Sequence, residues 1–114
     1  MNEYNIIEEF RKVYKEFEKY EGKKWVPEVI MTELSKQVGE LAKYVMLKEG
    51  AYFLGRENEE KYKFTMEDIG DEMVDVIDQV TRLADYYEID LVEASKRARK
   101  NDWEFFKKLK GKNE

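Results

Sequence analysis

The sequence has no cysteine and no histidine among its 114 residues. Without cysteine there is no disulfide, thiol nucleophile, iron–sulfur cluster or thiolate zinc site. Without histidine there is no imidazole general base, no Ser-His-Asp triad and no Glu-x-x-His di-iron site. Any bound metal must therefore take oxygen ligands, which favours Mg²⁺, Mn²⁺ or Ca²⁺.

Long apolar runs are missing too, since no stretch approaches the roughly 20 residues of a membrane helix. The first ten residues are polar and acidic, unlike a signal peptide. The net charge of −5, from 21 basic and 26 acidic residues, argues against broad binding to duplex nucleic acid. We therefore expect a cytoplasmic protein that binds neither a membrane nor duplex nucleic acid.

Helix breakers are scarce, with one proline and six glycines, and apolar residues recur at helical spacing. Pro27 suits a helix start, and the pairs Thr65–Asp68 and Asp90–Glu93 suit helix caps. The pattern predicts four helices, at about residues 2–20, 27–48, 66–87 and 91–110, with a loop and a short helical turn at 50–64. We expect residues 1–114 to form a single all-α domain of the four-helix-bundle type.

The third predicted helix carries an unusual run of acids without any lysine or arginine between Phe64 and Thr81. These acids are Glu67, Asp68, Asp71, Glu72, Asp75 and Asp78. Like charges three or four residues apart repel on a helix, and the helix dipole relieves only the first turn. Two interpretations remain open: a solvated surface opposite the apolar stripe, or a face that meets cations or basic residues.

The second and third predicted helices share one pattern. Their apolar stripes have spacings of 4, 3 and 4 residues: Leu34, Val38, Leu41, Val45 and Ile69, Met73, Val76, Val80. At the same offset from the stripe, each helix places two oxygen-bearing side chains three residues apart, Gln37 with Glu40 and Glu72 with Asp75. If the helices pack antiparallel, the two pairs converge and offer oxygen ligands to a hard divalent cation.

These residues resemble the MazG-like nucleotide pyrophosphatases. The segment from Pro27 through Ser35 and residues 38–42 resembles the first motif of that family, and residues 71–76 resemble its second motif, Glu-x-x-Asp. Residues 82–85 and 89–91 continue the match, and Arg97 with Lys100–Asn101 resembles the end of the last helix. The resemblance covers about Trp25 to Phe105, except residues 50–64. It implies an all-α, commonly oligomeric fold that hydrolyses nucleoside triphosphates to monophosphates and pyrophosphate.

The resemblance also implies roles for individual residues. Metal ligands for Mg²⁺, or for Mn²⁺, are then Gln37, Glu40, Glu72 and Asp75, of which Glu40 and Glu72 are also catalytic. Phosphate-binding residues are then Arg97, Lys100 and Asn101, and the base-binding residue is Trp25. The chain departs from the first motif, Glu-x-x-Glu, because Lys36 and Gln37 stand where the family has adjacent acids.

Three hypotheses follow. The first is a Mg²⁺-dependent nucleoside triphosphate pyrophosphohydrolase that assembles as a homodimer or homotetramer, because 16 aromatic residues exceed what one small bundle buries. The second is a catalytically impaired relative that binds nucleotide or acts in helical assembly, which Lys36 and Gln37 motivate. The third is a plain helical interaction module, in which the acids are all surface charge. For Trp25, core packing or an oligomer contact is the alternative to base stacking.

Overall fold

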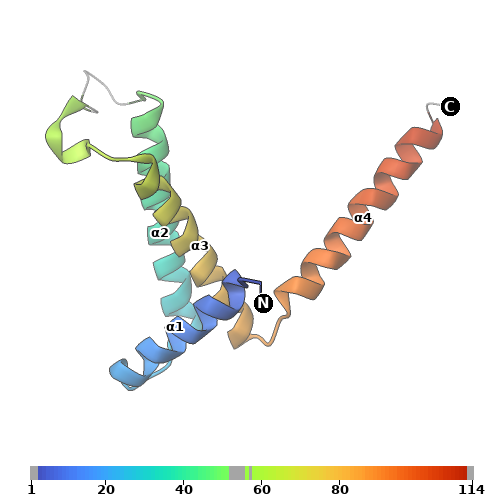
Figure 1. Cartoon of the computed structure of the whole chain (residues 1–114), viewed down its shortest axis with the longest axis horizontal. Coiled ribbons are helices and arrows are strands. Elements are labelled where there is room, and N and C mark those ends of the chain that lie inside the picture. The colour runs from blue at the N-terminus through green and yellow to red at the C-terminus, as the bar shows by residue number, and fades with distance from the viewer. Residues whose placement is uncertain (1–2, 52–55, 57, 113–114) are drawn as a thin grey trace. The chain divides into compact units, whose positions relative to one another are not determined.

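The computed structural model describes residues 3–51, 56 and 58–112 (Figure 1). In these ranges the chain forms helices and turns without a strand: α1 (Ile6–Glu21), α2 (Pro27–Lys48), the short 3-10 helix η2 (Glu60–Tyr62), α3 (Met66–Tyr86) and α4 (Leu91–Lys112). The all-α class predicted from the sequence is therefore confirmed. The chain divides into two compact units, Met1–Leu83 and Ala84–Glu114.

Side-chain caps decide where three of the helices begin. The Asn5 carboxamide oxygen accepts a hydrogen bond of 3.1 Å from the Glu8 N–H, so α1 starts at Ile6 rather than near Asn2 as predicted. Thr65 and Asp68 form the predicted reciprocal cap of α3, with bonds of 2.8 and 3.2 Å. The predicted cap of α4 is present as well, because the Asp90 carboxylate accepts from the Glu93 N–H at 3.1 Å.

Helices α1, α2 and α3 are each followed by a residue in the left-handed backbone conformation. Gly22 and Gly50 have φ values of 73° and 66°, which glycine adopts without steric cost. The end of α3 uses Glu88 in the same conformation, with φ at 56°. The Ile89 N–H then donates to the Ala84 carbonyl at 2.8 Å, which completes a Schellman motif around a residue with a side chain.

The last helix extends further than the sequence predicts. It runs to Lys112 instead of ending before Gly111. Gly111 is absent from the positive-φ residues, so it continues the helix rather than capping it. A helical glycine costs roughly 1 kcal/mol relative to alanine, a penalty small enough to be tolerated in a final turn.

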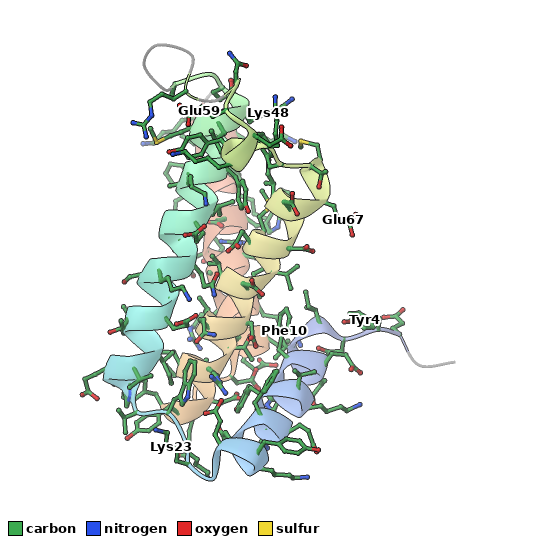
Figure 2. The ribbon with its side chains drawn as sticks, turned by 90° about the vertical axis from the view of Figure 1, so that its left-hand side faces the viewer. Tyr4, Phe10, Lys23, Lys48, Glu59 and Glu67 are labelled. Atoms are coloured by element: carbon green, nitrogen blue, oxygen red, sulfur yellow. The ribbon has the colours of Figure 1, made fainter. Side chains whose placement is uncertain are left out.

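Helices α2 and α3 form an antiparallel pair within the unit Met1–Leu83. Figure 2 labels Lys48, at the end of α2, and Glu67, at the start of α3, at the same end of this pair. Near that end the rings of Tyr44 and Phe64 lie 5.7 Å apart between centroids. Among the described residues of this unit, the buried apolar side chains are Tyr14, Ile30, Leu47 and Ile69.

Only part of each predicted apolar stripe is buried. Val38 and Val45 on α2 are each 47% exposed, and Met73 on α3 is 50% exposed. The buried side of α3 instead includes Gln79, Thr81 and Arg82. A 4-3-4 stripe covers a wide arc of a helix, and within this unit the contact between α2 and α3 occupies only one side of that arc.

In the unit Ala84–Glu114, α4 carries eight lysine or arginine residues against three acidic ones. Two ion pairs follow its surface, Lys96 with Glu93 at 3.3 Å and Arg99 with Asp102 at 3.0 Å. Over the ranges that the structure describes, none of the helices combines the length and the apolar character that crossing a membrane requires.

Candidate acidic site on α2 and α3

The antiparallel pair places two acid-bearing segments opposite each other. On α3, Glu72 and Asp75 are three residues apart and therefore share one side of the helix. The negative charge of Glu40, on α2, helps to raise the pKa of Glu72, and that of Glu33 helps to raise the pKa of Asp75. Glu40 and Glu33 thus act electrostatically across the helix contact, as the antiparallel hypothesis requires.

Among the described residues, Glu72 is the acid of α3 that has a buried oxygen without a hydrogen-bond partner. Its side chain is half-buried, and this oxygen is Oε2. Burial is the main cause that raises its pKa, followed by the charges of Asp75 and Glu40, while Lys43 acts in the opposite direction. The ionised form of Glu72 is therefore disfavoured unless positive charge is supplied.

The acids of α3 do not form one uniform solvated face. Glu67 and Asp71 are exposed, whereas Asp75 and Asp78 are half-buried. Burial raises the pKa of Asp75, and the charges of Asp71 and Glu33 add to the effect. Burial also raises the pKa of Asp78, although the guanidinium of Arg82 lowers it. The surface interpretation therefore suits Glu67 and Asp71 better than it suits Glu72, Asp75 and Asp78.

The residues of α2 that face these acids form hydrogen bonds and ion pairs within α2 itself. Glu40 forms an ion pair of 2.9 Å with Lys43. The Gln37 amide donates to Glu33 at 3.0 Å, and Lys36 pairs with the same carboxylate at 3.5 Å. Lys43 is not among the predicted site residues, although its spacing of three residues from Glu40 is the usual signal of such a pair.

The carboxylates of α2 and α3 meet the requirements of Mg²⁺ only in part. Over residues 3–51, 56 and 58–112, no three acidic side chains lie near enough to one another to hold a metal ion by themselves. Mg²⁺, however, is commonly bound by one or two carboxylates together with water and substrate phosphates. Glu40 and the unpartnered oxygen of Glu72 fit that second arrangement, in which the ion arrives with a phosphate ligand.

The residues predicted to bind phosphate lie on a different element. Arg97, Lys100 and Asn101 are exposed on α4, in the unit Ala84–Glu114, whereas the acids belong to the unit Met1–Leu83. Between them on α4, Arg99 is paired with Asp102. The structure therefore brings the four predicted metal ligands onto one helix pair and assigns the three phosphate-binding residues to a separate unit.

Trp25 lies in the segment between α1 and α2, and it is half-buried. Its indole N–H donates to the Glu21 carboxylate at 2.9 Å. The guanidinium carbon of Arg82 lies 4.0 Å from the centre of the Trp25 ring and 5.1 Å from that of Tyr14. Arg82 was overlooked as a site residue because no spacing rule connects it with an aromatic residue so far away in the sequence.

Comparison of the chain with models of known families, with curated proteins and with solved structures finds no match in any of the three. The function is therefore inferred from the chemistry of α2 and α3 and from the resemblance of the motifs.

Proposed function

We propose that the protein is a cytoplasmic, Mg²⁺-dependent nucleoside triphosphate pyrophosphohydrolase, which converts an NTP or dNTP and water to the monophosphate and pyrophosphate. The supporting observation is the Glu72 carboxylate, which is half-buried with one unpartnered oxygen and is influenced by the charge of Glu40 on the opposite helix. Burying carboxylates side by side costs free energy. A bound cation would supply positive charge at this position and would offset that cost.

The chemistry assigns a different task to each acid. Mg²⁺, when bound, supplies neutralisation of phosphate charge and orients ligands for in-line attack. Glu40 and Glu72 would hold the ion together with substrate phosphate and water, and Asp75 and the neutral oxygen of Gln37 are the remaining predicted ligands. The Glu72 carboxylate would also accept the proton of the attacking water, through the oxygen that does not bind the ion.

The motif resemblance supports the same proposal. Glu40, Glu72 and Asp75 coincide with acids of the MazG-like motifs, whereas Gln37 supplies no charge. Arg97, Lys100 and Asn101 would bind the triphosphate, and arginine in particular can grip two phosphate oxygens at once. The excess of basic residues on α4 favours attraction of such an anion.

Pyrophosphate release from a panel of NTPs and dNTPs, with millimolar Mg²⁺ or Mn²⁺, tests the proposal. We expect turnover of at least one nucleotide, and a loss of at least about 100-fold on Glu72→Gln, which removes a metal ligand and the base together. Glu67→Gln is the matched control, because Glu67 is an exposed glutamate on the same helix. Failure of every nucleotide to turn over would refute the proposal.

We propose further that the protein assembles as a homodimer or homotetramer. Apolar side chains of α2 and α3 remain substantially exposed: Val38, Val45, Met73, Val74, Ile77 and Val80. A second copy of the chain would bury such a surface. Light scattering that finds a dimer or tetramer would support assembly, and a monomer at working concentration would contradict it.

The alternative is a catalytically impaired relative that binds nucleotide or acts in helical assembly. It is favoured by the interactions within α2. Gln37 donates a hydrogen bond to Glu33, Lys36 forms an ion pair with Glu33, and Lys43 forms an ion pair with Glu40. This alternative predicts weak metal binding by calorimetry, and no activity even after Lys36→Glu and Gln37→Glu are combined. Activity of the unmodified chain that this double variant merely accelerates would exclude it.

A further inference from the structure

Lys43 on α2 acts on both carboxylates of the acidic pair. Its Nζ atom lies 2.9 Å from Oε2 of Glu40. Burial is the main cause that raises the pKa of Glu72, and the charge of Lys43 lowers that pKa from the opposite helix. The sequence of α3 contributes no lysine or arginine over residues 65–80. Lys43 therefore offsets part of the repulsion between Glu40 and Glu72 in the metal-free protein.

Lys43 differs in its surroundings from the other lysine of α2 that pairs with a glutamate three residues before it. The side chains of Lys43 and Glu40 are 38% and 40% exposed, and the Lys43 ammonium lies 5.1 Å from the centre of the Tyr44 ring. Lys36 pairs with Glu33 over 3.5 Å and is 66% exposed. The pair of Lys43 with Glu40 is thus less exposed to solvent, and salt screens it less.

A lysine ammonium and a divalent cation compete for the same carboxylate oxygens. Mg²⁺ takes oxygen ligands at about 2.0–2.1 Å, and Oε2 of Glu40 already accepts from Lys43. The two positive charges also repel each other, and the repulsion increases as they approach. An ion held by Glu40 and Glu72 would therefore drive the ammonium away from Glu40. The flexible four-carbon stem of lysine allows that movement without a change in the backbone.

We propose that Lys43 is an internal counter-ion of the acidic site, which the divalent cation displaces and which then binds the phosphate of the substrate. This inference rests on the proposed function and deepens it by naming a phosphate-binding residue within the unit Met1–Leu83. The residues that the resemblance implies for phosphate belong to the unit Ala84–Glu114. Lys43 lies on the same helix as Glu40, and a lysine ammonium binds phosphate as a point charge.

Calorimetric titration with Mg²⁺ alone, and separately with Mn²⁺ alone, tests the displacement without any nucleotide. Lys43→Met removes the ammonium and keeps an unbranched side chain. In low salt we expect this variant to bind both ions about three- to tenfold more tightly than wild type, because the repulsion between ammonium and ion is lost. Lys43→Arg keeps the positive charge, so it should not tighten the binding of either ion.

Lys48→Met is the matched control for the loss of one positive charge. Lys48 is exposed in the last turn of α2, and Figure 2 shows it at the end of that helix. From Glu40 to Lys48 the helix axis rises by about 12 Å, which exceeds the screening length at physiological salt. The control should change the affinity for Mg²⁺ by less than about 1.5-fold.

The binding of phosphate is tested with magnesium tripolyphosphate, which carries neither base nor sugar. Calorimetry should show that Lys43→Met binds this probe about tenfold more weakly than wild type, or weaker still, and that Lys43→Arg recovers most of the loss. Tighter binding of the ion combined with weaker binding of the phosphate distinguishes the proposed role from a structural one. A distortion of the site would weaken the binding of both.

The inference would be overturned if Lys43→Met bound Mg²⁺ and Mn²⁺ no more tightly than wild type, or if neither ion bound to any of these proteins. Binding of magnesium tripolyphosphate that is unchanged in Lys43→Met would overturn it as well. If circular dichroism shows that Lys43→Met does not fold, Lys43→Gln removes the same charge and carries the same expectations.

These measurements are separate from the test of hydrolysis. Tighter metal binding and weaker triphosphate binding by Lys43→Met, in a protein that hydrolyses no nucleotide, would support the counter-ion and refute the proposed activity. Hydrolysis by a protein whose metal affinity does not respond to Lys43→Met would refute the counter-ion and leave the proposed activity in place.

Discussion

The substitution Glu72→Gln should stabilise the protein at pH 7 when no divalent metal is present. It removes a charge from a half-buried position and nearly preserves the shape of the side chain. Burial and the charges of Asp75, Glu40 and Asp71 disfavour the ionised carboxylate, and Lys43 alone favours it. We therefore expect that a carboxylate that binds a functional ion lowers the stability of the metal-free protein.

The expected gain follows from these neighbours. Solvated like-charge pairs on helices cost about 0.2–0.5 kcal/mol each, and an opposite-charge pair returns a similar amount. Three repulsive neighbours and one attractive one leave about 0.5–1 kcal/mol in favour of the glutamine. For a chain of this size, that gain corresponds to an increase in Tm of roughly 2–5 °C.

The pH dependence of stability gives a second test of the sign of the effect of Glu72→Gln. The pKa of Glu72 in the folded state is raised above its ordinary value of 4.5. For such an acid, the folded state binds more protons than the unfolded state between the two pKa values, so stability falls as pH rises through that interval. Well below pH 4.5 the carboxyl is neutral in both states, and the difference in stability between wild type and Glu72→Gln should disappear.

Thermal unfolding followed by circular dichroism, at pH 7 and below pH 4.5 in low salt, measures both effects. Glu67→Gln is the control, because Glu67 is exposed in the first turn of α3, where the helix dipole favours an acid. It should leave Tm unchanged or slightly lower. A Glu72→Gln variant that is less stable at pH 7, or a difference that persists at low pH, would refute the reasoning.

Three further predictions concern the ion and the helix ends. Millimolar Mg²⁺ should raise the Tm of wild type but not that of Glu72→Gln. When the Mg²⁺ concentration equals Kd, the gain in the free energy of unfolding is about 0.4 kcal/mol. Equal shifts of Tm in both proteins would exclude Glu72 as a ligand. Glu88→Gly should stabilise the chain by about 1 kcal/mol in urea unfolding, because it relieves a left-handed backbone, and a loss would show that the glutamate side chain is needed. Asn5→Ala should cost about 1 kcal/mol in the same assay through loss of the α1 cap, and an unchanged midpoint would show that the cap bond contributes nothing.

Local signals predicted the helices well because their determinants are close in sequence. Pro27 at the start of α2, and the reciprocal bonds of Thr65 with Asp68, each involve neighbouring residues. The end of α3 carried no such signal, because Glu88 occupies a position where glycine is the usual residue. The start of α1 was placed too early because nothing in the pattern distinguished Asn5 from Asn2 as the cap.

Tertiary features were harder to predict, since they depend on which side of a helix meets its neighbour. The sequence predicted that Glu40 lies on one helix of an antiparallel pair and that Glu72 and Asp75 lie on the other, but not that Lys43 would pair with Glu40. Nor did it indicate that Arg82 would be buried against Trp25, because a charged residue on an amphipathic helix is normally expected in water.

The burial of Arg82 has a consequence for proteolysis. Trypsin cleaves after lysine and arginine, and Arg82 is the only such residue between Lys63 and Lys96. Its side chain is 6% exposed, and the peptide bond that follows it lies within α3. Cutting at this bond requires the helix to open, so the rate at which residues 64–96 are split would report the local opening of α3 in the native protein.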